Sequence, residues 1–245
     1  MKSHFKFSLS VVSHGQGALI RPLLEDLCRD QAERGRRYEV LLTLNISEDE
    51  SFVEEFADRL QLLVIRNMVP KGFGANHNAA FSASSGEIFV ILNPDIRLQR
   101  FPDDWIAASL TETTGAWAPL VRSSSGSVED SFRRFPTIAR LFQRAVLRRR
   151  HPDYVAKDAP IDVDWVAGMF IAFRRTTYAD LRGFDERYYM YMEDVDICHR
   201  LHLRGLSVML DPRVHVVHDA QRASRRSWQH RRWHLRSALR YLIGV

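Results

Sequence analysis

The stretch "EIFVILNPD" at residues 87–95 places five consecutive apolar residues directly before Asn93, Pro94 and Asp95. A short apolar run bounded by turn residues is typical of a strand that is buried on both faces. An acid fixed at the end of such a strand can hold a divalent cation through one oxygen and leave other positions for phosphates and water. The same three residues are also good turn formers. The segment therefore predicts a buried strand, with a metal site and a simple turn as alternatives for Asp95.

Strand-like and helix-like segments alternate before this strand. Strands are expected at 5–13, 38–45 and 60–67, and helices at 18–34, 47–60 and 74–84. This rhythm predicts an α/β fold with a doubly wound, mostly parallel sheet. Such sheets bind ligands at the carboxyl ends of their strands, and polar residues follow the strands at Ser13, Asn45, Ser47, Asn67, Asn93 and Asp95. No glycine-rich dinucleotide or P-loop motif follows any strand, which excludes these two common nucleotide sites.

The second half of the chain is less regular. Residues 163–175 form an apolar, strand-like run with Gly168 inside it, and residues 176–188 predict a short helix closed by Gly183. Because there is no internal repeat and no linker composition, we expect one domain over 1–245. It would comprise a nucleotide-binding half (about 1–100), an acceptor and catalytic half (about 101–212) and a basic C-terminal segment (213–245).

Composition limits the class of protein. The chain has 245 residues, 45% of them hydrophobic, so a large core can be buried and disorder is not expected. No apolar run reaches the length of a membrane span, and the apolar stretch near the N-terminus is too short for a signal sequence. Cys28 and Cys198 lie far apart and form no metal-binding spacing, so two reduced thiols in a cytoplasmic protein are expected.

Positive charge is concentrated in two segments. Residues 213–245 contain eight arginines and one acid, and residues 133–150 contain seven arginines. The planar guanidinium group suits phosphate oxygens, so an anionic partner is one interpretation and a solvated helix face is the other. The clusters lack the interleaved aromatic residues of a nucleic-acid stacking platform and match no nucleic-acid motif, so no nucleic-acid partner is expected.

The segment "YMEDVDICHR" at 191–200 holds three acids within four positions: Glu193, Asp194 and Asp196. Acids are favourable in the first turn of a helix, so a solvated helix start is one explanation. However, the aromatic segment "FDERYYMYM" precedes them, and adjacent carboxylates raise each other's pKa, which a general base can use. A helix start, a metal site and a catalytic base remain the alternatives.

Together these segments resemble the glycosyltransferases of family 2, which have the GT-A fold, and especially the rhamnosyltransferase-like branch that builds bacterial surface polysaccharides. The resemblance runs from about residue 7 to residue 240 and rests on the order of the motifs. The matching segments are "LSVVSH" (9–14), "LNISED" (44–49), "NMVPKGFGANHNAA" (67–80), "ILNPDI" (91–96), "DWVAGMFIAFRR" (164–175), "GFDERYYMYMEDVDICHRL" (183–201) and "VVHDAQRAS" (216–224).

The resemblance implies a role for each matching residue. It implies that Asp194 is the general base, with Glu193 beside it to orient the acceptor or tune Asp194, and that Trp165 and Gly168 shape the acceptor pocket. Asp95 would hold Mg²⁺ or Mn²⁺ on the donor diphosphate, and His218 would be a second ligand of the metal or a contact of the diphosphate. The nucleotide-sugar would be bound by Ser13, Asn45, Ser47, Asp49, Asn67, Lys71, Gly72, Phe73, Gly74, Asn78, Asn93 and Asp95.

The implied reaction is inverting sugar transfer from a nucleotide-sugar, with dTDP-rhamnose as the first expectation and a UDP-hexose as the alternative. The acceptor would be a lipid-linked or polysaccharide glycan. One departure is Leu44, which stands where the family usually has an aspartate that recognises the base or ribose. A nucleotide-binding homologue without turnover is therefore a second hypothesis.

The C-terminal segment suggests a further partner. In 228–245 the apolar residues Trp228, Leu235, Leu239 and Leu242 fall close to one helical face, and arginines lie on the other. An amphipathic helix of this type can lie in an anionic membrane interface, here at the cytoplasmic leaflet. It can also pack its apolar face on the protein. The oligomeric state is not predicted.

Overall fold

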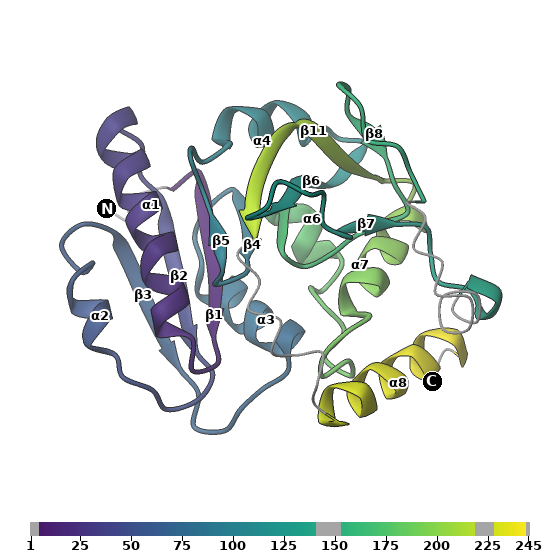
Figure 1. The fold of residues 1–245 in the computed structure, drawn as a ribbon, viewed down its shortest axis with the longest axis horizontal. Coiled ribbons are helices and arrows are strands. Elements are labelled where there is room, and N and C mark those ends of the chain that lie inside the picture. The colour runs from purple at the N-terminus through teal and green to yellow at the C-terminus, as the bar shows by residue number, and fades with distance from the viewer. Residues whose placement is uncertain (1–4, 141–152, 219–227, 244–245) are drawn as a thin grey trace.

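The structure is a computed structural model that describes residues 5–140, 153–218 and 228–243. Its first half alternates strands with helices, as the sequence predicts (Figure 1). The elements are β1 (Phe7–Ser13), α1 (Gly17–Arg34), β2 (Glu39–Leu44), α2 (Ser51–Glu54), β3 (Gln61–Arg66), α3 (Phe73–Ala83) and β4 (Ile88–Leu92).

The second half adds further strands to the same sheet. Its elements are β5 (Ile96–Arg97), α4 (Asp103–Ser109), β6 (Thr114–Ser123), β7 (Phe132–Arg133), β8 (Ile161–Asp162), β9 (Trp165–Val166), β10 (Phe170–Arg174), α6 (Arg175–Asp180), α7 (Glu193–His202), β11 (Ser207–His218) and α8 (Trp228–Ile243). The strand order is β3-β2-β1-β4-β10-β6-β11-β5, with β8 paired to β11.

The sheet is parallel from β3 to β4, where β1 pairs with both β2 and β4. β10 then runs antiparallel to β4 and β6, whereas β11 runs parallel to β6. The predicted fold class, a mostly parallel α/β sheet, is confirmed. The carboxyl ends of β1 to β4 lie at one edge, so the polar residues that follow these strands are neighbours, as expected.

Alternating strand residues build two cores, one on each face of the sheet. Leu9 and Val11 of β1 pack on the face with α1, whereas Phe89 and Ile91 of β4 pack on the face with α3, α6 and α7. Strands buried on both faces need apolar side chains at successive positions, which explains the uninterrupted run "IFVIL" in β4.

Two expected elements differ from those observed. The helix expected over 47–60 is reduced to α2, because the side chains before it bind loop amides. Glu48 accepts from Gly15 and Gly17, and Asp49 accepts from the Ser51 amide at 2.9 Å. The run 163–175 is not one strand: β9 pairs with β7 in a second small sheet, and only β10 joins the main sheet.

The basic segments differ in how they are placed. In 133–150, residue 133 belongs to β7, residues 138–140 are helical, and residues 141–150 lie outside the described residues.

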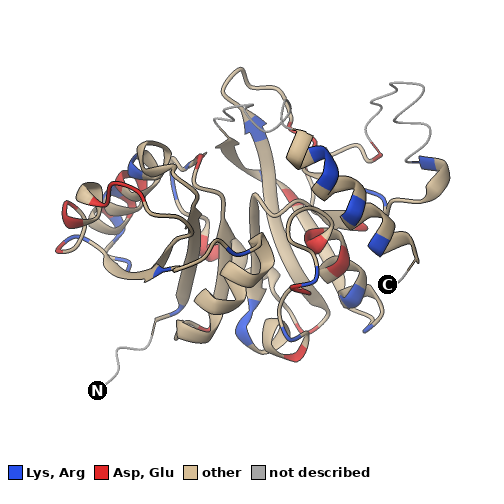
Figure 2. Ribbon diagram, turned by 90° about the horizontal axis from the view of Figure 1, so that it is seen from below, with Lys and Arg blue, Asp and Glu red and all other residues tan. Residues whose placement is uncertain are grey.

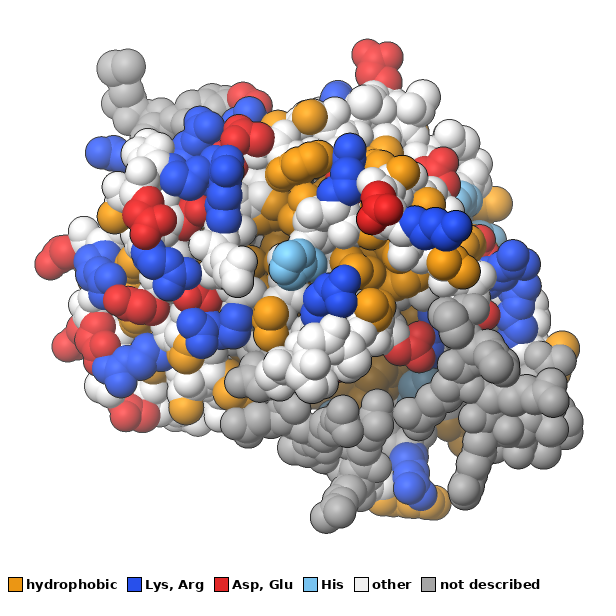
Figure 3. Space-filling model, turned by 45° about the horizontal axis from the view of Figure 1, so that its top comes forward, with side chains coloured by type: hydrophobic (Ala, Val, Ile, Leu, Met, Phe, Trp, Pro, Cys, Tyr) orange, Lys and Arg blue, Asp and Glu red, His pale blue; other side chains and the backbone are white. Residues whose placement is uncertain are grey.

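On the left of the face shown in Figure 3, basic and acidic side chains alternate over α1 and α4. Arg34 and Arg36 pair there with Asp103 and Asp104.

The C-terminal helix α8 forms as predicted but packs by an unexpected face (Figure 1). Ser237 and Ala238 are buried, whereas three of the four residues of the apolar stripe are exposed: Trp228 by 79%, Leu235 by 61% and Leu239 by 49%. Leu242, the fourth, is half-buried. The alternative in which the stripe packs on the protein is therefore wrong. No helix among the described residues has the length and apolarity to cross a bilayer.

Candidate functional site

An asparagine network closes the edge of the sheet after β2 and β3. The Asn45 side-chain oxygen accepts from the Lys71 amide and from Asn67, each at 2.8 Å, and its amide donates to the Lys71 carbonyl at 2.9 Å. Asn67 also donates to Asn76 at 2.6 Å. These bonds fix the backbone around Lys71, whose side chain is exposed. The network therefore gives the segment before α3 one defined shape.

The sequence Gly72-Phe73-Gly74 begins α3 and packs directly against the segment that leads to α7. The Phe73 amide donates to the Tyr189 carbonyl at 2.9 Å. A Cβ atom on Gly72 would lie 2.5 Å from that carbonyl oxygen, and one on Gly74 would lie 2.7 Å from Phe184. A Cβ atom on Gly168 would lie 2.8 Å from the ring of Phe73. Three glycines thus permit close contact between the two halves of the site.

The acid pair lies at the start of α7. Asp194 accepts two backbone hydrogen bonds, from Gly168 at 3.2 Å and from Val195 at 2.9 Å. Glu193 is buried, and its Oε2 has no hydrogen-bond partner among the described residues. Asp196 forms an i,i+4 ion pair with Arg200 at 2.8 Å, and Arg200 also binds the carbonyls of Leu181 and Gly183. Asp196 therefore supports the helix and the preceding turn.

The surroundings of Glu193 and Asp194 have different effects on the pKa values of the two carboxyl groups. Burial, followed by the nearby charge of Asp194, raises the pKa of Glu193 well above its usual range. Burial also raises the pKa of Asp194, but the Gly168 and Val195 amides favour its ionised form and hold the value at about 6. The two surroundings therefore favour ionisation of Asp194 over ionisation of Glu193. A carboxylate with this pKa can accept a proton near neutral pH.

The two residues before the pair have left-handed backbone torsions. Tyr191 has φ 70° and Met192 has φ 68°, a conformation that costs a non-glycine residue on the order of 1–3 kcal/mol. Contacts from α8 hold this segment. The Ser237 hydroxyl donates to the Met190 carbonyl at 2.8 Å, and the Tyr191 hydroxyl lies 2.8 Å from His230 Nδ1. Contacts with helix α8 therefore stabilise the strained segment that precedes the acid pair.

Asp95 and His218 meet at the end of β4 and β11. His218 Nε2 lies 3.2 Å from Asp95 Oδ2, and both side chains are mostly buried. Asp95 Oδ1 is buried and has no hydrogen-bond partner among the described residues. An imidazole next to an unsatisfied carboxylate oxygen fits a divalent cation. Among the described residues, no group of three histidine, cysteine, aspartate or glutamate side chains is placed to hold a metal ion.

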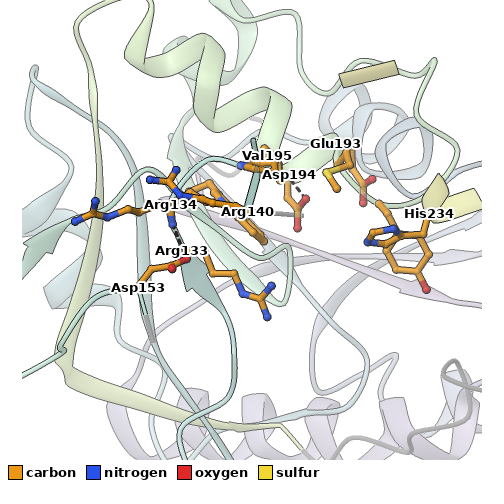
Figure 4. Close-up of a pocket in the computed structure, with 12 residues that line it drawn as sticks. Arg133, Arg134, Arg140, Asp153, Glu193, Asp194, Val195 and His234 are labelled. Atoms are coloured by element: carbon orange, nitrogen blue, oxygen red, sulfur yellow. Dashed lines mark hydrogen bonds between the residues drawn. The ribbon is translucent and has the colours of Figure 1, made fainter. Parts of the chain in front are cut away.

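A pocket of about 450 Å³ opens beside the acid pair (Figure 4). Asp194 and Glu193 line it together with Trp165, whose indole N–H donates to the Arg134 carbonyl at 3.0 Å. Arg133, Arg134 and Arg140 lie on one side of Asp194 in this view, and His234 of α8 lies on the other. Trp165 is thus placed at the pocket by the structure, and Gly168 contacts the acid that lines it.

Several residues expected at the nucleotide site have other contacts. Ser13 is fully buried and accepts from the Gln16 amide at 3.0 Å. Asn78 uses both ends of its amide on the 178–186 segment: it accepts from Tyr178 and Phe184 and donates to the Phe184 carbonyl and Glu186. Ser47 and Asp49 are exposed at the edge, and Asn93 donates its backbone amide to Met169. The side chains of Ser13 and Asn78 therefore hold neighbouring backbone segments in position.

The sequence interpretation missed some residues of the site. Asn76 lies within the matched segment 67–80 and is an asparagine like its hydrogen-bond partner Asn67. It could therefore have been identified from the sequence. Arg134 and Arg140 belong to the basic cluster, but nothing in the pattern indicated which arginines reach the pocket. Tyr191, His230 and His234 gave no signal, because their positions follow from the packing of α8.

Comparison with known proteins identifies the family of the chain. Residues 8–166 match the family model described as Glycosyl transferase family 2. The chain is 29% identical to the rhamnosyltransferase WbbL of Escherichia coli K12 over 95% of its length and 90% of that protein. It is 35% identical to the N-acetylglucosaminyl-diphospho-decaprenol L-rhamnosyltransferase of Mycobacterium tuberculosis, over 53% of the chain and 46% of that protein.

Solved structures show the same fold. The mannosyltransferase PcManGT of Pyrobaculum calidifontis, in complex with GDP-Man and Mn²⁺, superposes with a TM-score of 0.61 at 20% identity, over 98% of this chain and 65% of that one. GalNAc-T7 with UDP, GalNAc and Mn²⁺ gives a TM-score of 0.67 at 17% identity. This chain is aligned over 89% of its length but spans only 43% of GalNAc-T7.

We expect Gly72→Ala to lower the free energy of unfolding by about 1–3 kcal/mol, the usual cost of inserting a methyl group into a well-packed contact. The reason is steric, since Gly72 has φ −68°, which alanine adopts freely. Chemical denaturation measures the change. Ser82→Ala, on the exposed side of the same helix, is the control and should change stability by no more than about 0.5 kcal/mol. Equal effects of the two substitutions would contradict the assigned contact.

Proposed function

We propose a rhamnosyl transfer for this chain, which belongs to glycosyltransferase family 2 and is a glycosyltransferase. Rhamnose would move from dTDP-rhamnose to a lipid-linked or polysaccharide acceptor in cell-envelope glycan synthesis. The names of the two rhamnosyltransferases support the sugar and the type of acceptor. The proposal is carried by the acid pair Glu193 and Asp194, which lines a pocket large enough for a sugar and in which two backbone amides favour the ionised form of Asp194.

Asp194 is proposed as the general base. Its carboxylate takes the proton of the acceptor hydroxyl while the hydroxyl oxygen attacks the anomeric carbon of the donor sugar, and the bond to the diphosphate oxygen breaks. The raised pKa of Glu193 favours its protonated form, which is a poor nucleophile, so a covalent sugar intermediate on it is not expected. A single displacement inverts the configuration at the anomeric carbon. Glu193 would instead orient the acceptor.

Asp95 and His218 are proposed to hold Mg²⁺ or Mn²⁺ together with the donor diphosphate. The buried, unsatisfied Asp95 Oδ1 supports this assignment, and two of the similar solved structures contain Mn²⁺. When bound, the cation would neutralise charge on the departing nucleoside diphosphate. The Asn45 network keeps the Lys71 segment in place at the same edge, where Lys71 and Asp49 can reach the nucleotide.

The outer face of α8 is proposed to lie on an anionic membrane surface. Trp228, Leu235 and Leu239 of the stripe are exposed, as is Ile243, and Arg231, Arg232 and Arg236 of the same helix are exposed as well. Figure 2 shows the basic positions along α8 in blue. Apolar side chains can enter the interface while arginines bind lipid phosphates. This placement would bring the pocket, which His234 of the same helix lines, to a lipid-linked acceptor at the cytoplasmic face.

We expect Asp194→Asn to lower kcat by about 10²–10⁴-fold, the usual contribution of a general base, with donor affinity unchanged. The wild-type rate should fall as the pH drops below about 6, because Asp194 then becomes protonated and cannot accept the hydroxyl proton. Steady-state kinetics with a dTDP-rhamnose donor measure both effects. Glu193→Gln is the matched control. If this variant lost more activity than Asp194→Asn, Glu193 would be the base and Asp194 would orient the acceptor.

We expect Asp95→Ala to abolish Mn²⁺-dependent donor binding while the fold stays intact, because the side chain ends a strand at the edge of the sheet. Titration calorimetry with dTDP in the presence and absence of Mn²⁺ measures the effect. Asp49→Ala, at the exposed end of the same edge, should keep the metal dependence. Unchanged affinity in Asp95→Ala with Mn²⁺ would remove Asp95 from the metal site.

We expect the protein to sediment with anionic phosphatidylglycerol vesicles and to be released as salt rises, since surface attraction is screened over ~10 Å at 0.1 M ionic strength. Replacing Arg231, Arg232 and Arg236 by glutamine should reduce binding. The control replaces Lys157, Arg182 and Arg204, which are exposed elsewhere, and changes the charge equally. Equal binding by both triple variants, or no vesicle binding at low salt, would refute the membrane surface.

A further inference from the structure

The pocket beside Asp194 has a basic wall that the sugar-transfer reaction leaves unexplained. Arg133, Arg134 and Arg140 line it, and Figure 4 shows them grouped on one side of Asp194. A neutral sugar needs hydrogen-bond partners but no concentration of positive charge. Three guanidinium groups around one cavity therefore indicate an anion.

The charge of this wall is only partly balanced. Arg133 forms an ion pair with Asp130. Among the described residues, neither Arg134 nor Arg140 forms an ion pair through its guanidinium group. The Arg134 group lies over the Tyr154 ring at 5.7 Å, and Arg140 donates to the Phe135 carbonyl at 2.8 Å. One acid, Asp153, lines the same side and accepts from the Arg134 backbone amide at 3.2 Å.

The wall is held in place by hydrogen bonds from neighbouring strands. Besides the bond from Trp165 to the Arg134 carbonyl, the Phe135 amide donates to Asp164 Oδ2 at 2.7 Å. Asp164 is fixed in turn by the Tyr154 hydroxyl at 2.6 Å. Because these bonds fix the backbone at Arg134, less conformational freedom of this segment is lost when an anion binds.

The wall is distinct from the proposed donor-diphosphate site. Asp95 and His218, the proposed cation ligands, do not line this pocket, whereas Trp165 and the proposed base do. An anion on the arginines therefore belongs to the molecule whose hydroxyl approaches Asp194. That molecule is the acceptor.

We infer that Arg134 and Arg140 bind the diphosphate of a polyprenyl-diphosphate-linked sugar acceptor, so that its sugar reaches Asp194. The inference rests on the proposed function, since it assumes that Asp194 is the base that receives the acceptor hydroxyl. The arginine fork matches two phosphate oxygens at once, which favours this class of acceptor over a neutral glycan. His234 lines the pocket from α8, so a lipid chain bound there would lie near the helix proposed to face the membrane.

Binding of farnesyl diphosphate, a water-soluble probe, tests the inference without any transfer step. Titration calorimetry should show binding of farnesyl diphosphate that Arg134→Gln and Arg140→Gln each weaken at least about tenfold, the loss expected for one charge-assisted hydrogen-bonded pair. Farnesol and glucuronate should bind much more weakly than the diphosphate. Arg204→Gln is the control with the same charge change and should bind as the wild type does.

Two results would overturn the inference. One is equal affinity for farnesyl diphosphate in the wild type and in both pocket variants, with the fold verified by circular dichroism. The other is competition between saturating dTDP with Mn²⁺ and farnesyl diphosphate, which would assign the arginines to the donor. If dTDP-rhamnose proved not to be the donor, neither binding result would change, so the two proposals fail independently. Arg134→Lys separates charge from geometry and should restore only part of the affinity.

Discussion

The hydrogen bond from the Phe73 amide to the Tyr189 carbonyl joins the two halves of the site. It can form only because Gly72 has no side chain at the point where the backbones meet. One partner begins α3, which follows the asparagine network at the nucleotide edge. The other belongs to the segment that leads to Asp194. The distance between the proposed donor site and the proposed base therefore depends on this contact.

The segment after Tyr189 must turn sharply before α7 begins. Tyr191 and Met192 adopt left-handed torsions, and α8 holds them through Ser237 and His230. The turn presents Asp194 to two backbone amides and leaves Glu193 buried without a partner for Oε2. Strain in the backbone is thus offset by packing of the C-terminal helix, which links the basic segment of the chain to its acid pair.

The sequence predicted the first half of the fold well, because buried parallel strands and intervening helices leave strong local patterns. It predicted less of the second half. The run 163–175 divides between two sheets at Gly168, a division that depends on contacts with Phe73 and Asp194 and not on local hydrophobicity. The apolar stripe of α8 was identified, but its exposure follows from the small residues Ser237 and Ala238 on the opposite face.

For the site, motif order indicated the acids, Asp95 and His218, and the structure brings each pair together. The order of the motifs alone could not separate residues that contact a ligand from residues that hold the backbone in position. Asn78 is an example, because its side-chain amide already forms hydrogen bonds with Tyr178 and Phe184. The order of the motifs also could not choose among the arginines of the 133–150 cluster. Both distinctions require the three-dimensional contacts.

We expect the two adjacent buried acids, Glu193 and Asp194, to hold opposite charge states at neutral pH. Carbon-13 NMR of the side-chain carboxyl carbons of Glu193 and Asp194 tests it most directly, with signals assigned through Glu193→Gln and Asp194→Asn. We expect the Asp194 signal to titrate with a midpoint near 6 and Glu193 to keep its protonated chemical shift through neutral pH. An ionised Glu193 beside a protonated Asp194 at neutral pH, or ordinary titration of both below pH 5, would contradict it.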